Sequence, residues 1–279
     1  MFGFLARLLS GPRRNVPDAV TEAALAAVRA AAKPTILLES AQEGMTAARI
    51  GGLPHLPADC EWPRRDGHPL SFIAEIDLAA VHRSTGPEWL PAGGYLHVFY
   101  DADAQPWGLY PADQTGWKIV LTDHRSEQPL PAPIDLKAGL RFNERSLSAR
   151  RSVSYPEPER LSVVDYDFEA MENLLERPIG VEPGHRIGGY PSPVQNDTME
   201  LEAQLASNGV DLSQPEAYHS PETKSLEAGA DAWRLLLQVD SDDDAGMMWC
   251  DSGRLYFWVR EQDACIGDFS RVWTILQTC

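Results

Sequence analysis

The distribution of proline restricts how this chain can fold more than any other feature of its sequence. The 279 residues include 22 prolines, and eleven of them lie between Pro54 and Pro133. Proline has no backbone N–H to donate, and its ring clashes with the preceding helical turn. Because 43% of the residues are apolar, as in ordinary globular proteins, we expect a turn-rich chain around a substantial core.

Short runs of apolar, aromatic and β-branched residues predict six strands. These runs occupy residues 35–38, 71–77, 94–100, 117–122, 233–239 and 254–259. The chain is therefore predicted to be mainly β, or a β-rich α+β protein with antiparallel sheets.

Four segments have the composition or spacing of helices: residues 16–33, 164–177, 197–208 and 269–277. The first ends before Pro34 and the third ends at Gly209, and both residues are typical helix stops. In the last segment, Phe269, Val272 and Leu276 follow helical spacing. We therefore expect an added N-terminal helix and a C-terminal helix packed on the sheet.

A short motif occurs twice. Residues 49–54 (Arg-Ile-Gly-Gly-Leu-Pro) and 186–191 (Arg-Ile-Gly-Gly-Tyr-Pro) are identical at five of six positions. Two further pairs of segments align in the same order, 71–77 with 234–240 and 94–96 with 253–255. Such ordered self-similarity predicts an internal duplication into two similar antiparallel-sheet halves.

The duplication suggests a simple domain organisation. An N-terminal basic tip and helix over residues 1–34 would precede one domain over 35–279. The first half would span about 35–160 and the second about 161–279, with the polar stretch 148–159 as the boundary between them.

The charge balance excludes one class of partner and favours another. There are 24 basic and 41 acidic residues, which gives a net charge of −17. No excess of Lys and Arg is available to displace phosphate counterions, so we expect no nucleic-acid binding. A negative field of this size speeds association with basic proteins.

The cysteines and the N-terminus predict a cytoplasmic protein. The four cysteines are scattered and form no C-x-x-C pair, which favours reduced thiols. The apolar run at residues 2–9 is far shorter than the roughly 20 residues of a membrane span. Basic residues follow this run, the reverse of a signal peptide, so we expect no stable membrane anchoring.

Several motifs resemble the YwqG-like family of bacterial proteins. They are Gly189-Tyr190-Pro191 with Gln195, the run LLLQVDSDDDAGMMW at 235–249, Asp251-Ser252-Gly253 before LYFW, and in the first half IGGLP at 50–54, PLSF at 69–72 and IDL at 76–78. The resemblance covers about residues 35–279 and implies a mainly β, duplicated fold with no established biochemical function. It also implies a small residue, usually Gly, at the position of Cys250, so we do not expect a catalytic Cys250.

Charge and family analogy together favour a non-enzymatic function. We expect an acidic binding protein that engages a basic protein partner, for instance a toxin that it would neutralise in an immunity-like role. The alternative is a metal-dependent enzyme or small-ligand protein with a site between the halves, near Asp240–Asp251.

One acidic loop has the spacing of a calcium site. Asp240, Asp242, Asp244 and Asp251 occupy positions 1, 3, 5 and 12 of such a loop, and their oxygens would suit Ca²⁺ or Mg²⁺. However, glycine stands at position 7 rather than 6, and strands rather than helices flank the loop. The alternative is a turn in which some Asp side chains cap backbone N–H groups and others face water; on this interpretation no cofactor is expected.

The two repeated turns are candidate anion-binding or partner-binding sites. Their candidate residues are Arg49, Gly51, Gly52, Arg186, Gly188 and Gly189, to which we add Gln195 and Trp249 from the motifs of the resemblance. Backbone N–H groups beside an arginine can hold an anion. The alternative is a pair of strand-entry bends with glycines at positive φ and each arginine paired to an acid. Trp249 and the other tryptophans near the predicted strands are also expected in the core.

Overall fold

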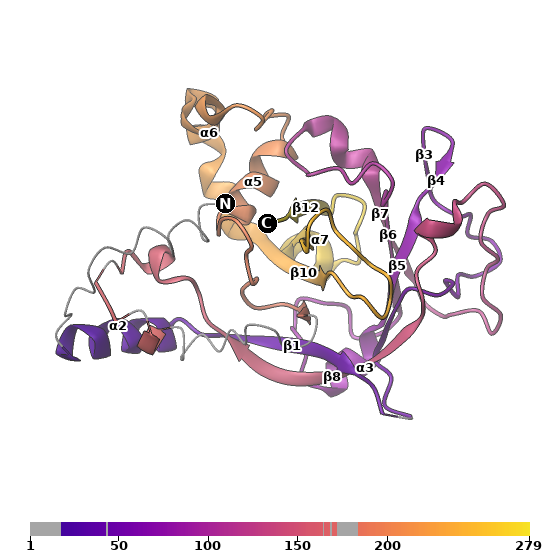
Figure 1. Cartoon of the computed structure of the whole chain (residues 1–279), viewed down its shortest axis with the longest axis horizontal. Helices are drawn as coiled ribbons and strands as arrows, with labels where there is room; N and C mark the ends of the chain where they lie inside the picture. The colour runs from indigo at the N-terminus through magenta and orange to yellow at the C-terminus, as the bar shows by residue number, and fades with distance from the viewer. Residues whose placement is uncertain (1–17, 43, 164, 168, 172–183) are drawn as a thin grey trace.

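The computed structural model describes residues 18–279 except 43, 164, 168 and 172–183. Ten antiparallel strands form one curved sheet that is nearly barrel-shaped, in the order β12-β11-β10-β9-β1-β8-β2-β5-β6-β7 (Figure 1). The strands are β1 (Lys33–Ser40), β2 (Ala48–Ile50), β5 (Ser71–Asp77), β6 (Tyr95–Tyr100), β7 (Trp117–Thr122), β8 (Arg145–Ser154), β9 (His185–Ile187), β10 (Trp233–Asp240), β11 (Arg254–Arg260) and β12 (Trp273–Gln277). A separate small hairpin pairs β3 (Arg64–Arg65) with β4 (His68–Pro69).

Short helices accompany the sheet. They are α2 (Asp18–Ala30), α3 (Leu78–Arg83), α5 (Met199–Ala206), α6 (Pro221–Leu226) and α7 (Glu261–Cys265), with 3₁₀ turns η1 (Pro111–Gly116), η2 (Ala138–Leu140), η3 (Pro158–Leu161), η4 (Pro215–His219) and η5 (Glu227–Ala232). Helix α2 packs Leu25 and Val28 against Met171 in a small core of its own. Within the described part of the chain, no helix is both long and apolar enough to cross a membrane.

The centre of the sheet is the pair β1–β8. Their register runs from Lys33 opposite Ser154 to Ser40 opposite Leu147. On its other side β1 pairs with β9, while β8 pairs with β2. We call β2-β5-β6-β7 the first arm of the sheet and β9-β10-β11-β12 the second arm. Strand β1 therefore borders the second arm, and β8, which follows the first arm in the chain, borders the first arm.

The two arms share an irregularity. The register of β5 against β6 shifts between Phe72 and Ala74, and that of β10 against β11 shifts between Leu235 and Leu237. In both arms the short strand that carries Arg-Ile is next to the strand with the shift. A bulge of this kind increases the local twist and bends the strand.

The two ends of the sheet meet through tryptophans. The rings of Trp117 on β7 and Trp273 on β12 lie 5.2 Å apart, edge to face, and Trp117 Nε1 donates to the oxygen of Val272 at 2.8 Å. The loop before η1 covers the outer edge of β12, because Leu276 N donates to Trp107 O at 3.2 Å. Edge strands that are covered in this way cannot pair with another chain.

Much of the predicted secondary structure is confirmed. The mainly β character, the helices at 16–33 and 197–208, and all six predicted strands are present, as β1, β5, β6, β7, β10 and β11 with α2 and α5. The expected sheet halves form one continuous sheet rather than two separate ones. The basic tip at residues 1–17, and residues 164, 168 and 172–177 of the helix predicted over 164–177, lie outside the described residues.

The predicted C-terminal helix at residues 269–277 is wrong. Residues Trp273–Gln277 form β12, paired with β11, and all five are buried. A helix at the surface would expose one face, whereas this segment is covered on both faces. A short, fully buried strand shows apolar residues at many spacings, including helical ones.

The polar stretch at residues 148–159, predicted as the boundary between the halves, is in part a strand that was not predicted. Residues 145–154 form β8, in the middle of the sheet. Several of its polar side chains are exposed, among them Arg150, which pairs with Glu39 of β1 at 2.6 Å. Strands β1 and β2 supply hydrogen-bond partners for its backbone. The polarity of its side chains does not indicate these partners.

Gly108→Ala is expected to lower the free energy of unfolding by about 2–4 kcal/mol. A Cβ at Gly108 would lie 1.9 Å from the backbone oxygen of Thr274 on β12, at a φ of +79°. Urea denaturation measures this change. Gly139→Ala is the control, because a Cβ there has no described atom within 4 Å, and we expect less than about 0.5 kcal/mol. Equal effects would contradict the importance of this close approach for closing the sheet.

Candidate functional site

The repeated turns are sharp bends that only glycine can make. Gly51 and Gly52 have φ values of +63° and +72°, and Gly188 and Gly189 have +69° and +73°. A Cβ on Gly51 would lie 2.1 Å from the oxygen of Asn143. These glycines are therefore required by backbone geometry.

Arg49 lies at the centre of a buried charged cluster in the first arm. Its guanidinium is 3.0 Å from Glu75 Oε1 and 2.7 Å from Glu144 Oε2. Arg49 and Glu75 are both buried, whereas Glu144 is half exposed. Glu75 also meets Arg125 at 3.5 Å and accepts from the backbone N–H of His55 at 3.2 Å. Each carboxylate oxygen of Glu75 therefore has a donor or a cation beside it.

His97 is the titratable group buried beside this cluster. Its Nε2 is 3.1 Å from Thr122 Oγ1, and its Nδ1 is 3.4 Å from Glu75 Oε2. Burial lowers the pKa of His97 to about 4; Glu75 opposes this shift, and Arg49 and Arg125 add to it. The imidazole is therefore neutral at neutral pH.

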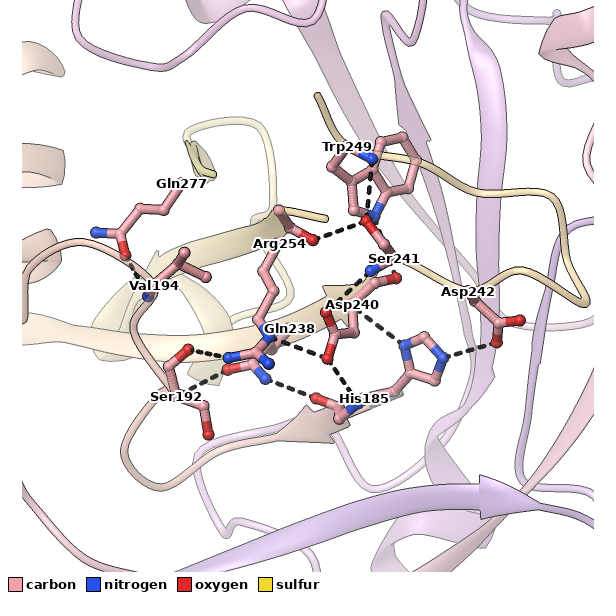
Figure 2. Close-up of polar contacts among 12 residues, drawn as sticks. His185, Ser192, Val194, Gln238, Asp240, Ser241, Asp242, Trp249, Arg254 and Gln277 are labelled. Carbon is pink, nitrogen blue, oxygen red and sulfur yellow. Dashed lines mark hydrogen bonds and ion pairs between the residues drawn. The ribbon is translucent and has the colours of Figure 1, made fainter. Parts of the chain in front are cut away.

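The second arm repeats this arrangement with a neutral group. Arg186 Nη1 donates to Tyr190 O at 3.3 Å, as Arg49 donates to Leu53 O at 3.5 Å. On β10, Gln238 has the place that Glu75 has on β5, and its Oε1 accepts from Ser192 N at 2.9 Å (Figure 2). Its amide nitrogen donates to Gly184 O at 2.6 Å.

Asp240 and Asp242 of the predicted metal loop point inward to arginines. Asp240 Oδ2 lies 2.9 Å from Arg254 Nε and accepts from Gly184 N at 2.9 Å. Asp242 forms an ion pair with Arg145 from β8 and accepts from Ala245 N at 2.9 Å. These contacts occupy both carboxylates.

His185 joins the two carboxylate groups (Figure 2). Its Nδ1 accepts from the backbone N–H of Asp240 at 3.2 Å, so Nε2 carries the proton and donates to Asp242 Oδ2 at 3.2 Å. Burial raises the pKa of Asp242, but the bonds from His185 and Ala245 and the charge of Arg145 outweigh burial and lower it to about 2. Asp242 is therefore ionised throughout the physiological range.

The other two predicted metal ligands face away. Asp244 and Asp251 are exposed, and the described polar contacts of Asp251 involve only its backbone, with Thr278 and Cys279. Among the described residues, no three His, Cys, Asp or Glu side chains are placed to hold a metal ion. The loop is a turn in which Asp242 caps the N–H of Ala245 while Asp244 and Asp251 face water.

Gln195 and Trp249 both make contacts within the protein. Gln195 Nε2 donates to Thr278 O at 2.9 Å, which fixes the end of the chain against the loop after β9. Trp249 is fully buried, donates from Nε1 to Asp240 O at 3.2 Å, and packs against Tyr100 and Phe142. The four cysteines are free thiols, and Cys250 has a φ of +50°, which a glycine would adopt more easily.

Several residues of these clusters are not among those predicted from the sequence. Glu75 was detectable, because it aligns with Gln238 in the repeat. His97 then follows as the neighbour of Glu75 across the β5–β6 pair. Arg145 and His185 lie 97 and 57 residues from Asp242 and belong to no local motif. Only the strand order β9-β1-β8 brings them to the loop.

The family of the chain can now be stated. The model of a family described as a domain of unknown function (DUF1963) matches residues 48–279. The chain belongs to this family. The DUF1963 match begins at Ala48, the first residue of β2, so α2 and β1 precede it. It includes the residues around Arg49 in the first arm and around Arg186 in the second arm. No curated protein matches the chain.

The buried His97 predicts a specific acid sensitivity. Above pH 6.5 the ring is neutral in both the folded and the unfolded chain. As the pH falls from 6.5 to about 4, only the unfolded chain binds the proton, so stability should fall by about 2–4 kcal/mol. His97→Gln should reduce this loss in urea denaturation at pH 7 and pH 4.5, whereas His124→Gln, at an exposed position, should leave it unchanged. An identical pH dependence in His97→Gln would contradict the assignment.

The acidic loop can be tested for metal without disturbing its ion pairs. Asp244→Asn with Asp251→Asn removes the two exposed carboxylates and leaves Asp240 and Asp242 on their arginines. We expect millimolar Ca²⁺ to change the melting temperature of wild type and variant equally, by general screening alone. A rise of several degrees in wild type that the double variant lacks would establish a calcium site.

Proposed function

We propose that this chain is a non-enzymatic binding protein that engages a basic protein partner through one surface. We name this surface the acidic loop face. It consists of exposed residues from three segments: Asp103, Trp107 and Tyr110; Asp211 and Glu216; and Asp243, Asp244, Met248 and Asp251.

The three segments are joined by hydrogen bonds. Gln105 Oε1 accepts from Cys250 N at 2.8 Å, which connects the loop before η1 with the loop after β10. Leu212 N donates to Leu109 O at 2.9 Å, which connects the same loop with the segment before η4. The loops that carry the acidic loop face are therefore in contact with one another.

Three large apolar side chains are exposed on this face, and this observation carries the proposal. Trp107, Tyr110 and Met248 are 38%, 45% and 46% exposed. Tryptophan, tyrosine and methionine are enriched at protein interfaces, where a few such anchors supply most of the binding energy. Large apolar side chains gathered on one face of a soluble protein indicate an interaction site.

The charges around these anchors favour a basic partner. Asp103 pairs with Lys137 at 2.5 Å, while Asp211, Glu216, Asp243, Asp244 and Asp251 have no basic group within ion-pair distance among the described residues. The buried carboxylates Glu75, Asp240 and Asp242 are instead held by arginines. The uncompensated charge therefore lies at the surface, where it attracts cationic proteins.

The proposal can be tested by capture and reconstitution. The tagged chain is used to capture proteins from a native cell extract at about 50 mM and about 500 mM salt, and each captured protein is identified and purified. We expect a protein of high isoelectric point whose binding weakens at high salt. Trp107→Ala with Met248→Ala should weaken the reconstituted complex at least tenfold. Val153→Ala, at an exposed position on β8, should not. A partner that is acidic, or that binds the double variant equally well, would refute the proposal.

We infer that the protein is a YwqG-like member of its family, acts in the bacterial cytoplasm, and engages its partner in an immunity-like manner. The motifs around Gly189-Tyr190-Pro191 and Asp251-Ser252-Gly253 support the first inference. The free thiols support a reducing compartment. The charge of the acidic loop face supports neutralisation of a basic protein.

We also infer that the chain arose by internal duplication. The mirrored strand order on either side of β1–β8 supports this inference. The register shifts at Phe72 and Leu235 fall at aligned positions and support it too. So do the equivalent bonds of Glu75 to His55 N and Gln238 to Ser192 N. Separate histories for the two arms would not explain hydrogen bonds shared at this level of detail.

A further inference from the structure

A polar cavity of about 290 Å³ is lined by residues that belong neither to the acidic loop face nor to the ion pairs of Arg49, Asp240 and Asp242. Its walls come from the start of β1, from η3, from the beginning of α5, and from η5 with the start of β10. Six of its lining residues carry charge: Lys33, Arg160, Asp197, Glu200, Asp231 and Arg234. In Figure 1, α5 and β10 lie next to one another on the side of the molecule toward α2.

Most of these charges are compensated within the protein. Arg160 Nη1 and Nη2 donate to Glu200 at 2.9 and 2.8 Å, and Nη2 also donates to Asp197 at 2.5 Å. Arg234 pairs with Glu261 at 2.6 Å and donates to the backbone oxygen of Asp231 at 2.7 Å. These groups form the frame of the cavity and have little capacity for a ligand.

Two opposite charges lack an ion-pair partner among the described residues. The Lys33 ammonium lies 4.2 Å above the centre of the Tyr190 ring, and no described carboxylate is within ion-pair distance of it. The carboxylate of Asp231 likewise has no basic partner among the residues that the structure describes. Both side chains line the same cavity.

The rest of the wall is partly apolar. Trp233 and Leu201 line the cavity, and Trp233 is held in place by Arg260, 4.6 Å from its ring centre, and by a hydrogen bond of 3.0 Å to Gln204. Trp233 is almost fully buried and therefore supports the wall, whereas the partly exposed Leu201 can contact the side chain of a small ligand.

We propose that this cavity binds a small zwitterion of amino-acid size, with the ligand's carboxylate at Lys33 and its ammonium at Asp231. The inference is independent of the proposed partner-binding function, because it uses none of the residues of the acidic loop face. It also differs from a ligand site near Asp240–Asp251, where the inward carboxylates of Asp240 and Asp242 are already held by arginines.

The electrostatics of Lys33 agree with an anionic group at its amine. Partial burial lowers the pKa of Lys33; the guanidinium groups of Arg160 and Arg234 add to this shift, and the carboxylates of Glu200 and Asp197 oppose it. A ligand carboxylate at Nζ would compensate these effects, whereas a purely cationic ligand would increase them. The zwitterion is favoured over an anion because Asp231 offers a matching site for its ammonium.

The test is a binding screen with single compounds. The twenty common α-amino acids, and ω-amino acids with two to five methylenes, are each titrated into the full chain by calorimetry. For the best binder, the amine that lacks the carboxylate and the N-acetylated acid are titrated as well. We expect saturable binding of at least one zwitterion, and at least tenfold weaker binding of both single-charge analogues.

Two variants and two controls connect this binding to the cavity. Lys33→Met and Asp231→Asn should each weaken binding at least tenfold, and both should fold, because neither side chain has an ion-pair partner among the described residues. Lys224→Met and Glu227→Gln change the same charges at exposed positions outside the cavity lining and should bind like wild type. The proposal is wrong if no zwitterion binds, if the single-charge analogues bind equally well, or if binding survives in either cavity variant.

Discussion

The rest of the fold depends on the antiparallel pairing of β1 with β8. Strand β1 borders the second arm, which follows β8 in the chain, and β8 borders the first arm, which follows β1. Neither arm of the sheet is therefore complete alone. The pair also holds both repeated turns. Thr35 of β1 donates to Gly188 O at 2.9 Å, Ser154 of β8 accepts from Tyr190 N at 2.8 Å, and Gly52 N donates to Phe142 O, just before β8, at 3.0 Å. Loss of this pair would separate the arms and release both turns.

The ion pairs of the two arms also depend on the position of β8. Arg145 begins β8 and reaches Asp242 in the second arm, while Glu144, the residue before it, reaches Arg49 in the first arm. Two consecutive residues at the start of β8 thus form ion pairs with both arms. Buried ion pairs contribute little net stability, because desolvation offsets their attraction, but leaving one partner alone is costly. Their main effect here is therefore on register, since a slip of β8 would leave Asp242 and Arg49 without these partners.

Sequence reasoning was reliable where the local pattern determines the local structure. The predicted strands 71–77 and 117–122 have the bounds of β5 and β7, because alternating or apolar runs between turn residues leave few other choices. It failed at β8 and β12. Polar β8 is a strand because β1 and β2 satisfy its backbone, and β12 is a strand because both of its faces are covered. Both facts depend on distant segments. Likewise the glycine bends follow from the motif, whereas His185 reaches Asp242 only through the strand order.

The difference between local sequence patterns and contacts with distant segments also determines which residues are available to bind a partner. The motifs that are most conspicuous in the sequence, the repeated turns and the acidic loop, are used by the fold: their glycines make bends, and their inward carboxylates are held by arginines. A carboxylate that is already paired and buried has no capacity left for a partner. The groups with that capacity are charges without an ion pair, such as Lys33 and Asp231 in the cavity, and exposed apolar side chains, such as Trp107 and Met248 on the acidic loop face. Lys33, Asp231 and Trp107 belong to no sequence motif, and the motif that contains Met248 does not indicate its exposure, because exposure and lack of an ion-pair partner are properties of the folded chain.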